Sequence, residues 1–193
     1  MVQFAPPAMT TLDLLLYGTP AEDFLSGGSG DDRIYGYAGP DHLHGYTGDD
    51  FLFGGDGPDE LKGGVGNDTL YGGAGKDRLW GGKGADYVHG GDGADKIVFH
   101  PDGDTVIGGK GADNLRISLT PDDPGGGHAT ARIDGLDHIF LQDVTDYDVT
   151  SVTTDGARLE AFTLVLDFDG RHATLDVFLN AATGTPDDYL ILC

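Results

Sequence analysis

The chain has 193 residues and a formal net charge of −22 at pH 7, from 33 acidic and 11 basic residues. A surface that binds phosphates needs a basic footprint, so this balance excludes a nucleic-acid partner. The single cysteine, Cys193, leaves no disulfide framework, and we expect no transmembrane segment because no stretch approaches the roughly 18 apolar residues that span a bilayer.

The first part of the chain, residues 1–17, is predicted to form an N-terminal segment that ends in a capping strand. Residues 1–9 show no periodic pattern and contain two prolines. Counting back nine residues from Leu25 gives Leu16, so TTLDLLLY at residues 10–17 should supply the first strand of the structure that follows. Terminal units of a repeat protein must cover the open end of the core.

Residues 18–116 consist of a nine-residue unit that is repeated eleven times without a gap. The sixth residue is always Asp and the eighth is always aliphatic. Asp makes up about a sixth of the chain, so this register has a chance probability on the order of one in a billion. The sixth-position residues are Asp23, Asp32, Asp41, Asp50, Asp59, Asp68, Asp77, Asp86, Asp95, Asp104 and Asp113.

The residue types in each unit predict a metal-binding loop followed by a short strand. Positions one to six are mostly Gly with one carboxylate, so the backbone can adopt positive φ angles and direct its carbonyl oxygens inward. Such an oxygen cage suits a hard cation, and calcium tolerates irregular geometry better than magnesium does. Positions seven to nine predict a three-residue strand with the eighth side chain pointing inward.

Units such as GGSGDDRIY and GGVGNDTLY resemble the nonapeptide G-G-x-G-x-D-x-U-x of the RTX (repeats-in-toxin) family of hemolysin-type calcium-binding repeats. The resemblance implies a parallel β-roll, a β-solenoid with 18 residues per turn. It also implies calcium ions between loops two units apart, bound by the sixth-position Asp side chains and by backbone carbonyls. These carbonyls are expected near Gly27, Gly36, Gly45, Gly54, Gly63, Gly72, Gly81, Gly90 and Gly108.

The number of calcium ions follows from how the loops stack. Eleven loops divide over two edges and leave nine gaps. The first loop has Ala21 at a Gly position, and the tenth has Phe99, His100 and Asp102 at positions that are usually Gly. Excluding the gaps next to these loops leaves about seven ions, which would change the net charge from −22 to −8. Tyr37 and Tyr46 replace the second Gly of two further loops.

Residues 117–193 are predicted to form a C-terminal antiparallel β cap, which makes the whole fold all-β. Of the 34 glycines, 27 lie in residues 18–116, so the remaining stretch is not expected to continue the roll. Its apolar and polar residues alternate as strands, and Asp169-Gly170 indicates a hairpin turn between two of them. The predicted strands are residues 130–134, 138–144, 148–154, 158–168, 171–179 and 188–192.

No catalytic constellation is found, so the chain is not expected to be an enzyme. H-E-x-x-H, G-x-S-x-G and a reactive cysteine are all missing. Asp167-Phe168-Asp169-Gly170 resembles the start of an EF-hand loop, but it lacks the third acidic ligand, and a plain hairpin is favoured. His42 and His44 should project outward beside Glu60 and Lys62, where the lysine charge opposes a transition metal.

The two outer faces of the predicted roll differ in composition, because residues 18 apart stack in columns. One face carries Tyr35, Phe53 and Tyr71, and the other gathers basic and histidine side chains. Stacked rings stabilise a sheet by themselves, which is one interpretation of the aromatic face. The alternative is that this face is covered by a second copy of the chain, by the cap, or by a flat ligand such as a glycan. The basic set is His42, His44, Lys62, Arg78, Lys96 and Arg116.

Two functional hypotheses remain open. The first is a structural and export module, secreted by the bacterial type I route through a dedicated exporter, which folds on calcium outside the cell or at its surface. The chain ends with Asp187 and Asp188 before an apolar run, which resembles a type I secretion signal and also fits a last strand. The alternative is an extracellular adhesin or polysaccharide-binding module.

Overall fold

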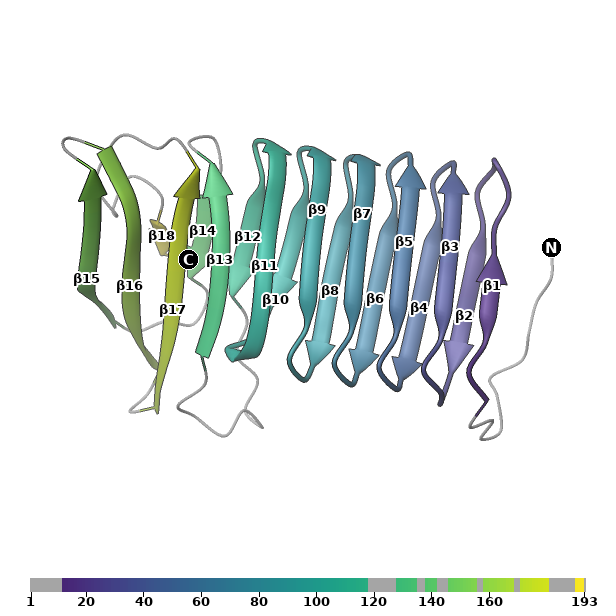
Figure 1. Cartoon of the computed structure of the whole chain (residues 1–193), viewed down its shortest axis with the longest axis horizontal. Coiled ribbons are helices and arrows are strands. Elements are labelled where there is room, and N and C mark those ends of the chain that lie inside the picture. The colour runs from purple at the N-terminus through teal and green to yellow at the C-terminus, as the bar shows by residue number, and fades with distance from the viewer. Residues whose placement is uncertain are drawn as a thin grey trace.

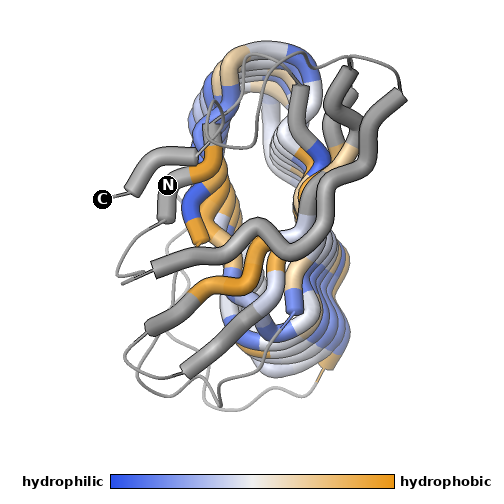
Figure 2. Tube along the Cα trace, turned by 90° about the vertical axis from the view of Figure 1, so that its left-hand side faces the viewer, coloured by the Kyte–Doolittle hydropathy of each residue, from blue (hydrophilic) through white to orange (hydrophobic). Residues whose placement is uncertain are grey.

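The structure is a computed structural model that describes residues 12–117, 128–134, 138–141, 146–155, 158–168, 171–180 and 190–192. Every regular element in these ranges is a β-strand. The chain winds into a flattened roll, and its coils stack side by side from β1 to the C-terminal strands (Figure 1). Seen along its length, the roll has two facing sheets joined by hydrophilic loops at its two edges (Figure 2). The predicted all-β solenoid is therefore confirmed.

The roll consists of two parallel sheets, in which neighbouring strands are 18 residues apart. Leu16 pairs with Ile34, which confirms the predicted first strand. Sheet A contains β1 (Leu15–Tyr17), β3 (Arg33–Ala38), β5 (Phe51–Asp56), β7 (Thr69–Gly75), β9 (Tyr87–Gly93) and β11 (Asp102–Gly111). Sheet B contains β2 (Phe24–Gly28), β4 (His42–Thr47), β6 (Glu60–Val65), β8 (Arg78–Lys83), β10 (Lys96–Phe99) and β12 (Asn114–Ile117).

Most strands of the roll are longer than the three residues that the sequence predicts. β5, for example, has six residues and extends into the first positions of the next unit. The reason is that these glycine positions also keep the parallel register, so that Gly55 pairs with Gly73. The backbone of the metal-binding loop is therefore part of the ladder, and one coil positions the loop of the next.

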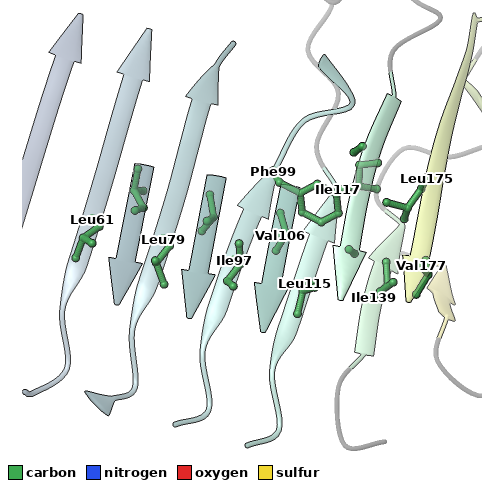
Figure 3. Close-up of a cluster of buried hydrophobic side chains, with 14 of the residues drawn as sticks. Leu61, Leu79, Ile97, Phe99, Val106, Leu115, Ile117, Ile139, Leu175 and Val177 are labelled. Atoms are coloured by element: carbon green, nitrogen blue, oxygen red, sulfur yellow. The ribbon is translucent and has the colours of Figure 1, made fainter. Parts of the chain in front are cut away.

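The core is a thin row of aliphatic side chains from the eighth position of each unit. From Ile34 to Leu115 these side chains are 0–2% exposed, whereas Leu16 and Leu25 in the first coil are only partly buried. Ile139, Leu175 and Val177 extend the same row beyond the repeats (Figure 3). Each strand from β3 to β9 contributes one inward hydrophobic side chain, and only β10 and β12 of the roll add a second, Phe99 and Ile117. Burial of this row therefore requires a neighbouring coil on both sides.

The C-terminal part both continues the roll and caps it, which corrects one expectation. β13 (His128–Asp134) pairs in parallel with β11, and β14 (His138–Leu141) pairs in parallel with β12. The expectation that the roll stops was wrong because glycine is needed for the loops and not for the strands. A strand joins the sheet if its inward residue is apolar, as Ala131 and Ile139 are, both fully buried.

The predicted antiparallel cap is present in three strands at the end of sheet A. β15 (Asp146–Asp155), β16 (Arg158–Phe168) and β17 (Arg171–Asn180) pair antiparallel, and β17 also pairs in parallel with β13. Phe168 pairs with Arg171, so the predicted hairpin exists, although Asp169 and Gly170 lie outside the described residues. In sheet B, β18 (Leu190–Leu192) pairs in parallel with β14.

Within the described ranges there is no helical segment of the length and hydrophobicity that crossing a membrane would require.

Candidate metal centres between stacked loops

The sixth-position carboxylates lie inside the roll, at its two edges. All of them from Asp32 to Asp113 are only 1–2% exposed, and Asp23 in the first loop is partly buried. Taking a carboxylate out of water is costly unless it is paired, hydrogen-bonded or bound to a metal. The hydrogen-bond partners of these ten buried side chains therefore indicate which ligand the loops can bind.

One oxygen of each carboxylate is held by the preceding coil. The N–H of Asp50 donates to Oδ1 of Asp68 over 2.8 Å, and the N–H of Asp59 donates to Oδ1 of Asp77 over 2.9 Å. The same hydrogen bond recurs on both edges of the roll, always between residues 18 apart. It holds each carboxylate in one orientation relative to the coil before it.

The other oxygen of most of these carboxylates is buried and has no hydrogen-bond partner among the described residues. Oδ2 of Asp68 is one example. It lies next to Gly63 of its own loop and next to the carbonyl oxygen of Gly81 in the following coil. Both oxygens lie where a Cβ atom on Gly63 would be, so the first position of the unit has no room for a side chain.

Further carbonyl oxygens point into the same gap from the second and fourth positions. Gly64 and Gly66 have φ angles of 129° and 141°, and their carbonyl oxygens point towards Gly82 and Gly84 of the next coil. Only glycine adopts these angles without strain. The gap between these two loops is therefore lined by carboxylate and carbonyl oxygens, the ligand set that calcium prefers.

The same arrangement recurs in seven gaps. In each, an Oδ2 atom without a hydrogen-bond partner among the described residues lies beside its own first-position Gly and beside the first-position carbonyl of the next coil. The carboxylate and carbonyl pairs are Asp32 and Gly45, Asp41 and Gly54, Asp50 and Gly63, Asp59 and Gly72, Asp68 and Gly81, Asp77 and Gly90, and Asp95 and Gly108. The described residues contain no cluster of three or more His, Cys, Asp or Glu side chains suited to a metal, so such a site depends on backbone carbonyls.

The first and tenth loops differ from the others, and their carboxylates are satisfied locally. Oδ2 of Asp23 accepts hydrogen bonds from the N–H and the hydroxyl of Thr19, at 2.5 and 2.8 Å. Oδ2 of Asp104 accepts one from the N–H of His100 at 2.7 Å. Phe99, at the first position of the tenth loop, is fully buried in the core. Neither loop offers a free carboxylate oxygen to the gap that follows it.

The two loops with Tyr at the second position keep the same backbone shape. Tyr37 and Tyr46 have φ angles of 78° and 83°, a left-handed conformation that costs a non-glycine residue roughly 1–2 kcal/mol. Their carbonyl oxygens nevertheless point at Gly55 and Gly64 of the next coil, as the equivalent glycine carbonyls do elsewhere. Stacking on the neighbouring coils therefore imposes the loop shape on both residues.

The acid–base properties of the buried carboxylates reflect their surroundings. Burial raises the pKa of Asp68 to about 7, although the hydrogen bond from the Asp50 N–H opposes this and the nearby Asp86 charge adds to it. Burial likewise raises the pKa of Asp95 to about 7 and that of Asp77 to about 6. Without a cation, burial therefore makes these groups easier to protonate than a carboxyl in water, and a bound cation would favour the ionised form.

Repeated cages of carboxylate and carbonyl oxygens along a parallel roll define the protein as a calcium-binding β-roll. The family model of the RTX calcium-binding nonapeptide repeat, which spans four copies, matches residues 17–52, 26–61, 44–79, 62–97 and 101–116. The chain therefore belongs to the RTX calcium-binding nonapeptide repeat family. Domains of this family are structural modules that bind calcium.

Two solved structures with similarity to this chain are repeat subunits of one enzyme. The first is the AlgE6R2 subunit of the Azotobacter vinelandii mannuronan C5-epimerase, with 20% identity, 96% of both chains covered and a TM-score of 0.31. The second is the AlgE6R3 subunit of the same epimerase, with 19% identity, 96% of this chain and 81% of that chain covered, and a TM-score of 0.25. No curated protein matches the chain significantly.

The histidines considered from the sequence lie where predicted. His42 and His44 project from β4 beside Glu60 and Lys62 of β6, with the lysine Nζ 2.6 Å from the Glu60 carboxylate. Sequence reasoning missed Glu22, whose carboxylate lies 4.0 Å from the His42 ring. It also missed the hydrogen bonds from Thr19 and His100, and the only signal for them was that their loops depart from the repeat.

Proposed function

We propose that the chain is a secreted structural module that folds when calcium fills the gaps between its stacked loops. The observation that carries this proposal is the row of seven buried Oδ2 atoms that have no hydrogen-bond partner in the described part of the chain and lie beside a backbone carbonyl of the next coil. A calcium ion in each gap would supply the missing partner of the Oδ2 atom that lies in that gap. The role is structural and not catalytic.

The proposed ligands follow from the free oxygens. Seven ions, one in each gap described above, are bound through the Oδ2 atoms of Asp32, Asp41, Asp50, Asp59, Asp68, Asp77 and Asp95. Asp86 and Asp113 belong to the loops that complete the gaps after Asp68 and Asp95. Oδ2 of Asp86 also has no partner among the described residues, but the next loop on its edge begins with Phe99 in place of Gly, so no ion is proposed there. Asp23 and Asp104, which sequence alone includes among the ligands, use Oδ2 in their own loops.

Folding without calcium is unfavourable for two physical reasons. The coils from β3 to β8 bury only two aliphatic side chains each, while their many glycines lose more conformational freedom on folding than other residues do. The stacked carboxylates repel each other, as the effect of Asp86 on the pKa of Asp68 shows. Because no preformed site exists in the unfolded chain, the free energy of calcium binding becomes free energy of folding.

Calcium-dependent folding couples the state of the protein to its compartment. Extracellular calcium modules commonly bind in the range of about 10⁻⁴ to 10⁻³ M, far above the calcium level inside cells. RTX repeat proteins are typically secreted by bacteria. The proposal is therefore that the chain stays unfolded in the cell and folds outside it or at its surface.

The direct test is a circular dichroism titration. In chelator the chain should show little β-structure, in millimolar calcium it should show the spectrum of the roll, and millimolar magnesium should be far less effective because it demands a regular octahedral site. Equal β content in chelator and in calcium would contradict the proposal. Counting bound calcium by competition with a chromophoric chelator tests the number of sites.

The proposal also includes the route of secretion, which is export by a type I exporter. The acidic pair Asp187 and Asp188, which lies outside the described residues, precedes β18. Deleting about the last ten residues should stop secretion through such an exporter, whereas replacing an equal length of β15 should not. Unchanged secretion after the deletion would remove this part and leave calcium-driven folding unaffected.

The proposed domains are residues 1–17, 18–116 and 117–193, with the middle one responding to calcium. The support is that the seven gaps in which a carboxylate oxygen without a partner among the described residues lies beside a first-position carbonyl all fall within residues 27–113. Hydrogen exchange at decreasing calcium should show residues 18–116 losing protection together. Uniform loss over the whole chain would instead indicate one cooperative unit.

A further inference from the structure

The outer face of sheet B is the part of this acidic protein where basic side chains gather. The register of β2 to β12 places the seventh and ninth residues of each unit on this face, in two adjacent columns. One column is Phe24, His42, Glu60, Arg78, Lys96 and Asn114, and the other is Ser26, His44, Lys62, Trp80, Val98 and Arg116. These twelve residues include four of the chain's 11 lysines and arginines and a single carboxylate.

Two of these basic side chains are direct neighbours. Arg78 and Lys96 are register partners on β8 and β10, and both are exposed. Neither forms an ion pair with another residue in the described part of the chain. Like charges that face each other across neighbouring strands destabilise a sheet. Glu60, the register partner of Arg78 on β6, offsets part of this repulsion, and an anionic ligand beside Lys96 would relieve the rest.

A shallow groove lies beside the basic residues, towards the N-terminal end of the same face. It has a volume of about 220 Å³, and its lining includes the side chains of Phe24, His42, His44, Glu60 and Lys62. The Phe24 and His42 rings stack at 4.5 Å with an interplanar angle of 5°, although Phe24 is 68% exposed. The groove therefore combines an exposed flat ring with hydrogen-bonding and charged groups.

More ring contacts continue from the groove along the face. The His44 and Tyr46 rings stack at 3.7 Å, and Lys62 Nζ lies 5.3 Å from the centre of the Trp80 ring. Tyr46 has a left-handed backbone conformation and occupies a loop position that is glycine in most other units.

We infer that the outer face of sheet B binds an acidic polysaccharide. The flat rings contact the apolar face of a sugar in the groove, Glu60 and Lys62 contact its hydroxyl groups, and Arg78 and Lys96 pair with the carboxylates of the next sugars. A polymer that runs along the roll crosses a strand about every 4.8 Å, so successive sugars meet successive strands. The inference rests on the proposed function only because calcium must first fold the roll.

The aromatic face of sheet A does not offer the same combination. Tyr35, Phe51, Tyr71 and Tyr87 contact one another in series, with ring centres 5.7–5.8 Å apart. Among the seventh- and ninth-position residues of β3, β5, β7 and β9, Arg33 is the only arginine or lysine, His89 is the only histidine, and none is a carboxylate. These rings pack on each other, which supports the interpretation that they stabilise the sheet.

The test is binding of a short oligogalacturonate to the full chain at a calcium concentration that saturates folding. The variant Arg78→Gln/Lys96→Gln removes the adjacent charges. The control Arg33→Gln/Lys76→Gln removes the same charge from sheet A and from a loop. We expect the first variant to lose about tenfold in affinity, or ~1.4 kcal/mol, and the control to stay within about twofold. Phe24→Ser should also weaken binding.

Several outcomes would overturn the inference. They are no binding of oligogalacturonate by the folded protein, equal losses in both double variants, or equally tight binding of a single-stranded DNA oligonucleotide, which would mark a general polyanion surface. Because galacturonate itself binds calcium, both double variants are compared at one buffered calcium level. Circular dichroism of the same samples separates the two proposals, since failure of calcium-driven folding is visible without any sugar.

Discussion

The N–H of Asp50 donates to Oδ1 of Asp68 over 2.8 Å, and Oδ2 of the same carboxylate is buried without a partner in the described part of the chain. Each such carboxylate thus belongs to two gaps, because one oxygen is bonded to the coil before it and the other lies beside a carbonyl of the coil after it. Oδ1 therefore has a structural role and Oδ2 a proposed metal-binding role. Substitution of the residue can test the two roles separately.

Replacing Asp68 with Asn should remove one calcium site while keeping the hydrogen bond to Asp50, since an amide oxygen still accepts it. We expect six bound ions in place of seven, and a loss of folding free energy of about 1–3 kcal/mol from the lost charged partner. Calcium counting by chelator competition gives the first quantity, and the calcium midpoint of folding gives the second.

The matched control is Asp49→Asn, one loop position away from a sixth-position Asp. Asp49 is exposed and accepts the N–H of Asn67, which already occupies the same column one coil later. The control removes the same charge but should keep all seven ions. Equal losses in both variants would show that general charge, and not the specific carboxylate, determines calcium binding.

Gly63→Ala should raise the calcium concentration needed for folding. The added Cβ would collide with Oδ2 of Asp68 and with the carbonyl oxygen of Gly81, which are backbone-anchored groups with little freedom to move. Overpacking of this kind typically costs about 1–3 kcal/mol. Val65→Ala in the same loop is the control, because that side chain is exposed and should be nearly neutral. A Gly63→Ala midpoint that matches the control would contradict the proposed cage.

Tyr46→Gly should stabilise the calcium-bound roll. Tyr46 has a φ of 83°, and relief of this conformation is worth roughly 1–2 kcal/mol, less the larger backbone entropy that glycine loses on folding. Tyr35→Gly, at a position without a positive φ, should instead destabilise. Thermal unfolding at fixed calcium measures both. A lower melting temperature for Tyr46→Gly would mean that the ring contact with His44 outweighs the strain.

The metal-free chain should gain β-structure as the pH falls. Burial raises the pKa of Asp50 to about 7 and that of Asp59 to about 6, from 3.8 in the unfolded chain. A raised carboxylate pKa means that the folded state binds protons more tightly. Its contribution to stability is therefore complete below pH 3.8 and is lost as the pH rises through 6 to 7.

Circular dichroism of calcium-free protein between pH 8 and pH 5 measures this effect. The roll signal should be weakest at pH 8 and should grow on acidification, whereas calcium affinity should fall over the same interval because protons compete with the ion. β content that is unchanged over this interval in the calcium-free protein would contradict the burial of ionisable carboxylates in the metal-free roll.

Much of this protein is determined by the local pattern of its sequence. Each nine-residue unit specifies its own turn and strand, and 18 residues bring the chain back to the same edge, so the inward position of Leu70 and the buried position of Asp68 follow from their place in the unit. In the seven gaps expected from the sequence, a carboxylate oxygen without a partner among the described residues lies beside a first-position carbonyl of the next coil. Oδ2 of Asp86 is also buried without such a partner, but the loop that follows it in the stack begins with Phe99 in place of Gly.

Two features became clear only from the tertiary structure. They are the hydrogen bonds in the two loops that depart from the repeat, and the pairing of strands beyond the repeat. The hydrogen bonds from Thr19 and His100 arise where a loop departs from the pattern and a backbone N–H comes within reach of the carboxylate. The continuation of the roll into β13 and β14 depends on pairing with β11 and β12. A parallel ladder requires only extended backbone and a small or apolar inward residue, and a short apolar strand does not by itself specify which edge it will join.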